Sequence, residues 1–358
     1  MDRADFLSVC GLAHERLGAD AVGAHGAHGA DRADQADQAD RADPAAYLPG
    51  AFICEAEAWL FSQLAARWSG RGRIVDAGSF LGASTRALIS GLPTSARERA
   101  SGASSKPIVA LDRFVVGDAY VQKALARLGQ ARGRGESFLD LFLDAIGADL
   151  RLVEVRAGDV TRVGRIDEPI ELCVIDLAKS QALNAHLLSS WFARLVPGVS
   201  VVVQQDFFSP FHPWIAASMA PLLPCFDLAP WRIGESAVFR LARPLSSEQI
   251  AAAAQRDPAD ALGWEETARW SEAFGADDMK LLRLGRCVAM SAATEAGRRA
   301  RAIREWEVLG SETPPAACPK WPRLMRLAGR ALGIETPPVS SPASEQAHPR
   351  VAVHGATS

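Results

Sequence analysis

Five aspartates stand at or just beyond the ends of five short apolar runs in the middle of the chain. They are Asp76, Asp112, Asp159, Asp176 and Asp206. A carboxylate accepts hydrogen bonds from an ammonium, a sugar hydroxyl or an amino group, and it binds divalent cations. Aspartate also caps helices and forms turns, which can place a single one at such a position. Five in the same relative position favour a ligand site over caps and turns.

The first aspartate opens the motif Asp-x-Gly-x-x-x-Gly, within the stretch RIVDAGSFLGASTRAL. Gly78 and Gly82 let a ligand approach the backbone, and Ser79 lies between them. A dinucleotide-binding turn needs a third glycine so that a pyrophosphate can reach a helix N-terminus. The acid of Asp76 would repel a pyrophosphate, but it suits a cation such as the α-ammonium of an amino acid. The turn therefore disfavours a nicotinamide-dependent oxidoreductase.

Two further aspartates extend this interpretation to a whole ligand. Asp112 ends the second apolar run, where a carboxylate can accept hydrogen bonds from both hydroxyls of a ribose. Asp159 follows the third run and can reach an adenine amino group. Ammonium, ribose diol and adenine together describe S-adenosylmethionine.

His212 is the histidine near these strand ends, in the stretch QQDFFSPFHPWI. Its ordinary pKa lies near neutrality, so it could serve as a general base. The alternative is a loop histidine enclosed by Pro210 and Pro213. The aromatic residues beside it could line an acceptor pocket or belong to the core; they are Phe207, Phe208, Phe211 and Trp214.

The aspartates depend on strands that alternate with helical segments. Because the strands are almost continuously apolar, they indicate a parallel sheet covered on both faces, and right-handed crossovers make it doubly wound. A hairpin is expected at the sheet edge, from Cys225–Trp231 and Glu235–Pro244 with Gly234 in the turn. The five earlier strands are expected at Arg73–Gly78, Pro107–Asp112, Leu150–Asp159, Ile170–Ala178 and Val199–Phe207.

The successive motifs IVDAGSFLGASTRAL, VALDRF, AGD, CVIDLAKS and LVPGVSVVVQQDF resemble those of the class I S-adenosylmethionine-dependent methyltransferases, in the small-molecule O-methyltransferase-like branch. The resemblance covers about residues 51–244. It implies a Rossmann-like α/β fold with a mostly parallel seven-stranded sheet whose last strand is antiparallel. It also implies that Asp76 and Gly78 lie by the methionine moiety, Asp112 at the ribose and Asp159 near the adenine. The full set of cofactor-binding residues that it implies is Asp76, Gly78, Ser79, Gly82, Asp112, Asp159 and Asp176.

The same resemblance implies a catalytic arrangement at the fourth and fifth strands. Magnesium-dependent, catechol-type relatives have an Asp-x-x-Lys like that of Asp176 and Lys179, with the aspartate on the metal and the lysine as base. Asp206 matches their further acid, so Asp176 and Asp206 could bind Mg²⁺. The chain departs from the branch at Asp176-Leu177-Ala178-Lys179, where many relatives have Asp-Gly-Asp-His, and at Phe207, where they have Asn or Asp. The alternative for Lys179 is a lysine that pairs with Asp176 for local structure.

The expected function is therefore that of a transferase, an S-adenosylmethionine-dependent methyltransferase that methylates a small molecule on oxygen, such as a sugar or specialised metabolite. Catalytic residues are expected to be Lys179, Asp176 and His212. A methyltransferase-fold module that has lost catalysis and serves in binding or assembly is the alternative, which the incomplete Asp-x-x-Lys region and the low-complexity extensions favour. Methyl transfer is an in-line displacement, so such an enzyme mainly positions its acceptor.

The composition bounds the remaining expectations. A net charge of −3 excludes the basic footprint of a nucleic-acid-binding protein, and no apolar run is long enough for a membrane span. The scattered cysteines and the absence of a signal peptide favour a cytoplasmic protein. The expected organisation is a low-complexity, largely disordered segment over 1–45, a methyltransferase-like domain over 46–245, a helical appendage over 246–310 and a disordered tail over 311–358, with one short basic helix around Arg323–Leu332. The appendage could act as a lid or a homo-oligomer surface.

Overall fold

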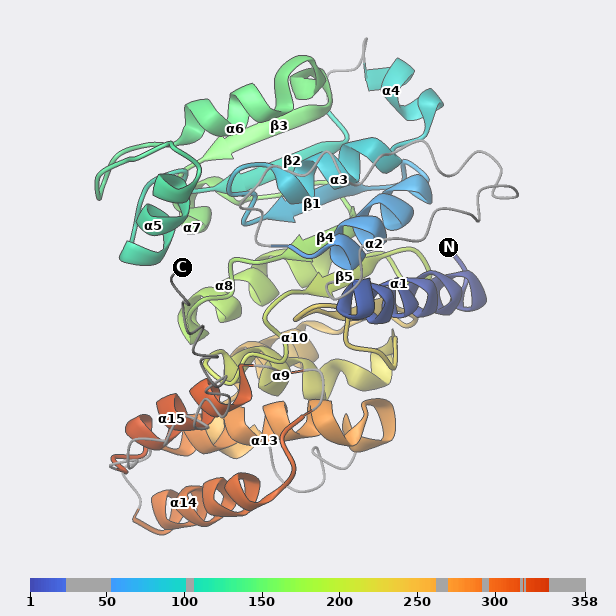
Figure 1. The fold of residues 1–358 in the computed structure, drawn as a ribbon. Coiled ribbons are helices and arrows are strands. Elements are labelled where there is room, and N and C mark those ends of the chain that lie inside the picture. The colour runs from blue at the N-terminus through green and yellow to red at the C-terminus, as the bar shows by residue number, and fades with distance from the viewer. Residues whose placement is uncertain are drawn as a thin grey trace, which may run out of the picture.

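A seven-stranded sheet forms the centre of the computed structural model, in the order β3-β2-β1-β4-β5-β7-β6 (Figure 1). The model describes residues 1–23, 53–100, 106–261, 270–291, 296–315, 318 and 320–334. The strands are β1 Arg73–Ala77, β2 Ile108–Asp112, β3 Val153–Ala157, β4 Ile170–Ile175, β5 Val201–Gln204, β6 Phe226–Leu228 and β7 Ala237–Leu241.

Strand direction follows the sequence expectation. The pairs β1–β2, β2–β3, β1–β4 and β4–β5 are parallel, whereas β7 runs antiparallel between β5 and β6. The predicted hairpin is confirmed, with Gly234 at φ 62° in its turn. The order reverses between β1 and β4, so the crevice outside their carboxyl ends is the expected place for a ligand.

Helices cover both faces of the sheet. The helices bear these bounds: α1 Arg3–Gly23, α2 Glu55–Ala66, α3 Ala83–Gly91, α4 Thr94–Ala100, α5 Ala119–Arg127, α6 Leu139–Ile146, α7 Val160–Val163, α8 Gln181–Trp191, α9 Pro213–Met219, α10 Ser247–Ala254, α11 Pro258–Ala261, α13 Ala276–Ser291, α14 Ala296–Ser311 and α15 Trp321–Ala331. Short 3₁₀ helices lie at Gly147–Leu152, Phe192–Arg194 and Ala220–Cys225.

Alternate residues of each strand enter two separate cores. Ile74 packs with α1, α2 and α3 on one face, whereas the next residue, Val75, packs with α8, α9 and the C-terminal helices on the other. Both side chains are fully buried. This two-sided burial explains why the strands read as continuous apolar runs.

The expectation of a largely disordered segment over residues 1–45 is wrong for its first half, where α1 forms. Phe6, Val9 and Cys10 of α1 are buried against the α2 side of the sheet. Arg67 at the end of α2 holds Asp5 with its Nε at 2.8 Å from Oδ2. Phe6, Val9 and Cys10, at helical spacing, thus pack α1 against the sheet next to the low-complexity repeat. The repeat itself, from residue 24, lies outside the described residues.

The C-terminal helices share the core of the sheet. Figure 1 shows α13, α14 and α15 as a layer beyond α9 and α10. Met279 and Leu282 of α13 belong to the same buried cluster as Met219 of α9. The expected short basic helix is present as α15, but Trp321 and Ala328 are buried, so the expectation of a disordered tail is wrong for this segment. Residues 335–358 lie outside the described residues. None of the described helices combines the length and hydropathy needed to cross a membrane.

Candidate active site at the carboxyl ends of the strands

Three non-glycine residues of the described chain have a left-handed backbone, and each lies two or three residues beyond the end of a strand. They are Phe80 (φ 44°) after β1, Phe114 (φ 51°) after β2 and Asp206 (φ 56°) after β5. Such a conformation costs on the order of 1–3 kcal/mol and tends to cluster at functional sites. The carboxyl edge of the sheet is therefore where this fold concentrates backbone strain.

The turn after β1 passes very close to the end of β4. Gly78 has φ 100°, and a Cβ atom there would lie 3.0 Å from the backbone and Cβ of Asp176. The amide of Asp176 in turn donates to the carbonyl of Ala77 at 2.7 Å. Gly82 also has positive φ, 88°, and caps α3. The close contact between the two strand ends therefore requires a glycine at position 78, and the approach of a ligand to this turn stays a prediction.

Asp76 is buried inside this turn, with 1% of its surface exposed. Its Oδ2 accepts hydrogen bonds from the hydroxyls of Ser84, at 3.0 Å, and Thr85, both in the first turn of α3. Ser79 donates to the backbone carbonyl of Asp76 at 2.9 Å. Burial raises the pKa of Asp76 to about 6, although these hydroxyls oppose the rise. Asp76 therefore joins β1 to α3. Its contact with the ammonium of a ligand stays a prediction.

Asp112 is held in place by two of the left-handed residues. Its Oδ2 accepts from the amide of Phe80 at 3.0 Å, and its Oδ1 accepts from the amide of Phe114 at 2.8 Å. Burial raises the pKa of Asp112, and these amide hydrogen bonds oppose the rise. Because each carboxylate oxygen has two lone pairs, both can still accept a hydroxyl hydrogen from a bound diol.

A hollow of about 340 Å³ opens between the ends of β2, β3 and β4, with Arg113, the residue after Asp112, in its wall. Its size falls in the range of small-molecule sites. Asp159 lies in its wall and accepts from the Thr161 hydroxyl at 2.8 Å, which lowers the pKa of Asp159. The amide of Gly158, also in the wall, donates to the carbonyl of Asp112 at 2.9 Å. The wall consists of Arg113, Gly158, Asp159, Val160, Thr161, Leu177, Ser180, Ala182 and Leu183.

Arg113 is a wall residue that the sequence analysis missed. It directly follows Asp112 and places a guanidinium beside the hollow. A guanidinium stacks readily on a flat aromatic ring. Its place next to the strand-end aspartate in VALDRF was the signal available in the sequence.

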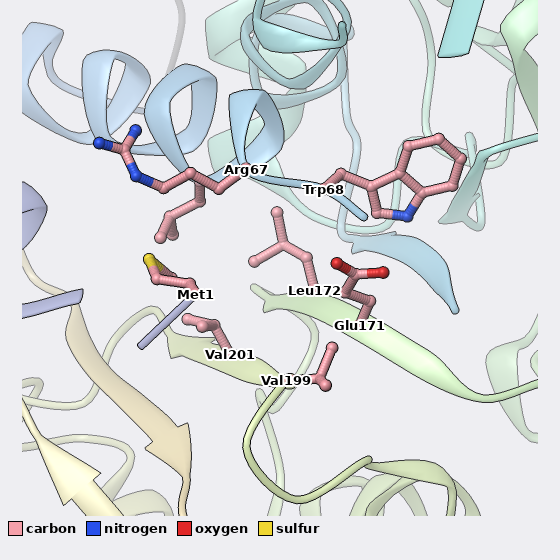
Figure 2. A pocket seen from close by; sticks show the side chains of 8 residues that line it. Met1, Arg67, Trp68, Glu171, Leu172, Val199 and Val201 are labelled. Atoms are coloured by element: carbon pink, nitrogen blue, oxygen red, sulfur yellow. The ribbon is translucent and has the colours of Figure 1, made fainter. Parts of the chain in front are cut away.

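A second hollow lies at the opposite end of the strands and is far smaller, at about 10 Å³. Figure 2 shows it between Leu172, Val199 and Val201, with Glu171 beside it. The Glu171 carboxylate accepts from the backbone amides of Ser69 at 2.6 Å and Arg71 at 3.0 Å, so it joins the loop between α2 and β1 to β4. This space holds about one water molecule, which makes it a packing gap and not an organic-ligand site.

Beside the larger hollow, Lys179 lies between two of the strand-end aspartates. Its Nζ is 2.5 Å from Oδ1 of Asp176 and also forms an ion pair with Oδ2 of Asp206. Burial alone would lower the pKa of Lys179, but the two carboxylates outweigh it, so the pKa is raised. A lysine base must lose its proton readily. The pairing predicted as the alternative for Lys179 is therefore present, and the geometry does not suit Lys179 as the base.

His212 faces the same cluster. Its Nδ1 lies 3.3 Å from Oδ2 of Asp206, and Trp214 packs edge-on against the ring at 5.4 Å. Burial lowers the pKa of His212, while the Asp206 carboxylate opposes this effect and the Lys179 ammonium adds to it. A histidine with a lowered pKa is neutral at physiological pH, which is the form that can accept a proton.

The carboxylates do not fit a magnesium ion in this arrangement. The Lys179 ammonium contacts both Asp176 and Asp206, so it takes the space that a shared cation would need. Within the ranges that the structure describes, no three His, Cys, Asp or Glu side chains converge as a metal site would require. Burial raises the pKa of Asp176 against the opposing effect of Lys179, and Asp206 adds to the rise.

The aromatic residues after β5 divide between core and site. Phe207 and Phe208 are fully buried and pack against Phe274 at 5.9 and 4.9 Å between ring centres. The indole of Trp214 is half-buried and donates to the carbonyl of Ala178 at 2.7 Å. Of the aromatic set, Trp214 is thus the one in contact with His212.

Glu57 on α2 is a buried carboxyl group that the sequence analysis missed. Its Oε1 accepts from the hydroxyl of Ser236 at 2.7 Å and its Oε2 accepts from the amide of Cys54 at 3.0 Å. Gln205 also bonds to it, and burial raises the pKa of Glu57. This contact joins α2 to the residue preceding Asp206. A glutamate within the apolar face of Cys54–Trp68 was the only signal in the sequence.

The chain is similar to a solved structure, whereas sequence comparisons find no relative. No family model matches the chain, and no curated protein matches it. Among solved structures, the chain is similar to the pyocyanin biosynthetic protein PhzM, with 18% sequence identity and a TM-score of 0.32. The similarity covers 53% of this chain and 56% of PhzM, so the chain spans about half of that protein. The fold class rests on the strand order and directions of the sheet itself.

Proposed function

We propose that this protein is a class I S-adenosylmethionine-dependent methyltransferase that transfers a methyl group to an oxygen of a small molecule. The observation that carries the proposal is the carboxylate of Asp112, which the amides of Phe80 and Phe114 fix one residue before Arg113 of the hollow's wall. The mostly parallel seven-stranded sheet, with its last strand β7 antiparallel, is the one that the sequence resemblance implied. Class I methyltransferases bind their cofactor at this edge of the sheet.

The chain's own residues fit such a cofactor in a defined order. Asp112 would accept hydrogen bonds from the ribose hydroxyls, and Asp159 would accept one from the adenine amino group. Arg113 would lie against the adenine ring, and Gly78 leaves the backbone open to the methionine part. When bound, the cofactor supplies a methyl group on a positively charged sulfur.

His212 is the base that the geometry supports. Nε2 of His212 would accept the proton of the acceptor hydroxyl, while that oxygen takes the methyl group that the bound cofactor would supply. The Asp206 carboxylate, 3.3 Å from Nδ1, would stabilise the positive charge that the ring gains. Positioning of the acceptor supplies the rest of the acceleration.

Calorimetry with S-adenosylmethionine and with NAD⁺ tests the proposal. The expected result is micromolar binding of S-adenosylmethionine, no binding of NAD⁺, and loss of binding in Asp112→Ala. A matched control is Asp118→Ala, which removes the cap of α5 outside the hollow. Failure of both S-adenosylmethionine and its demethylated product to bind the folded wild-type protein would overturn the proposal.

A turnover measurement distinguishes a methyltransferase from a catalytically inactive module that only binds the cofactor. Incubation with S-adenosylmethionine and a panel of hydroxylated small molecules should release the demethylated cofactor. Binding without release across sugars and phenols would favour the module. The small-molecule acceptor, the homo-oligomer and the cytoplasmic location remain predictions from the sequence.

A further inference from the structure

Lys179 occupies the centre of the acidic cluster beside the hollow. Its Nζ contacts one oxygen from Asp176, at the end of β4, and one from Asp206, at the end of β5. A divalent cation would bind these same carboxylate oxygens at about 2.0–2.6 Å. The ammonium and such a cation therefore compete for one place.

The backbone around Asp176 and Asp206 places both carboxylates beside the Lys179 ammonium. The amide of Asp176 is fixed to Ala77 of β1, and the amide of Lys179 donates to the carbonyl of Leu177 at 2.7 Å. Asp206 adopts a left-handed backbone, which aspartate tolerates better than most residues. Lys179 lies in the short segment between β4 and α8. The same segment contains Asp176, so it positions both side chains.

The charges of the cluster also fit an ammonium. Two carboxylates and one ammonium leave a net charge of about −1, with His212 neutral beside them. An ammonium has three N–H donors, and Asp176 and Asp206 receive two of them. The Lys179 side chain is 48% exposed, so a donor remains on the open side of the cluster.

We propose that the Lys179 ammonium is the resident cation of this site, in the place that a divalent metal would take, and that methyl transfer here proceeds without a metal. This inference rests on the proposed function. The ammonium balances the two carboxylates and donates its remaining N–H to the acceptor oxygen. His212, and not Lys179, then receives the proton.

Binding of Mn²⁺, measured by calorimetry and by its electron spin resonance signal, tests the proposal without cofactor or turnover. The wild-type protein should not bind Mn²⁺ at this site. Lys179→Ala exposes the two carboxylates, so it should bind Mn²⁺ roughly tenfold or more tightly than the wild type. The double variant Lys179→Ala with Asp206→Asn should lose that binding again.

Two further variants control for a general loss of positive charge. Lys179→Arg keeps a cation between the carboxylates and should not bind Mn²⁺. Lys280→Ala removes a lysine that pairs with Asp277 on α13 at 3.3 Å, and it should behave like the wild type. Circular dichroism and thermal unfolding confirm that each variant is folded.

Two results would overturn the proposal. One is stoichiometric Mn²⁺ binding by the wild type that Asp206→Asn removes. The other is a folded Lys179→Ala protein that gains no Mn²⁺ affinity. The failure of S-adenosylmethionine to bind is a separate result, because it concerns the hollow at Asp112 and leaves the Mn²⁺ measurement unaffected.

Discussion

Gly285 of α13 lies directly against Pro210, whose Cα is 3.3 Å from the point that a Cβ at Gly285 would occupy. Pro210 belongs to the loop that carries His212, two residues later. The side of α13 facing Pro210 is thus part of the support for the candidate base. This contact links the C-terminal helices to the chemistry of the sheet edge.

Replacement of Gly285 by a large side chain should therefore disturb turnover more than cofactor binding. In Gly285→Leu, the added atoms displace Pro210 and shift His212, with an overpacking cost of roughly 1–3 kcal/mol. Activity measured with S-adenosylmethionine should fall, while calorimetric affinity for the cofactor should stay near that of the wild type.

Gly297→Leu on α14 is the control, because open space surrounds that glycine. It should leave turnover unchanged. Equal losses of turnover in both variants would show that Gly285 has no special role in supporting the loop.

The pH dependence of turnover should reveal His212 as the base. Burial lowers the pKa of His212, so the base is neutral over most of the physiological range. The rate should rise with pH through a pKa below the ordinary value of about 6.5 and then level off. A pH–rate profile of kcat/KM measures this directly.

Removal of the imidazole should lower the plateau of that profile by roughly 10²–10⁴-fold. His212→Gln tests this, and His186→Gln on α8 is a control that keeps a half-buried polar side chain away from the cluster. Asp206→Asn keeps a residue that tolerates the left-handed backbone, and it should move the rising limb to lower pH because the carboxylate raises the pKa of His212. An unchanged limb in Asp206→Asn would contradict the pairing.

Asp76 should make the protein less stable as the pH rises. The pKa of Asp76 is about 6 in the folded protein and near its ordinary value of 3.8 when unfolded. The folded state therefore holds the proton more tightly, and ionisation between about pH 4 and pH 6 costs roughly 3 kcal/mol. This loss should be absent in Asp76→Asn, whose amide oxygen can still accept from Ser84 and Thr85.

Urea unfolding at pH 4 and at pH 7 measures the effect. The free energy of unfolding of Asp76→Asn, relative to the wild type, should be higher at pH 7 than at pH 4. Asp144→Asn, at an exposed position of α6, should show no such difference. A relative stability that does not change with pH would mean that Asp76 is not buried as a carboxyl group.

Gly78→Ala should weaken both stability and cofactor binding. Its φ of 100° disfavours any side chain, and the new Cβ would press on Asp176 at 3.0 Å. A loss of roughly 1–3 kcal/mol in the free energy of unfolding is expected, from thermal or urea melts. Gly117→Ala, in a loop with open space around it, should be tolerated. Equal tolerance at both positions would contradict the close contact between the ends of β1 and β4.

The sequence was sufficient to predict the sheet and its ligand-facing edge. Continuous apolar runs such as RIVDA and IVALD identify strands buried on both faces, and their alternation with helices requires parallel crossovers. Parallel strands bring their carboxyl ends to one edge, so Asp112, Asp159 and Asp176 had to lie near one another. These conclusions depend on local pattern and chain connectivity.

Only the tertiary structure decided what each strand-end side chain contacts. Asp76 turned inward to Ser84 and Thr85, and Lys179 reached Asp206, which follows a different strand, β5. Helix α1 escaped prediction because its burial depends on a partner surface formed by α2, beyond the low-complexity repeat. Contacts of this kind are set by side-chain packing between segments distant in the chain, and spacing along the sequence does not encode their geometry.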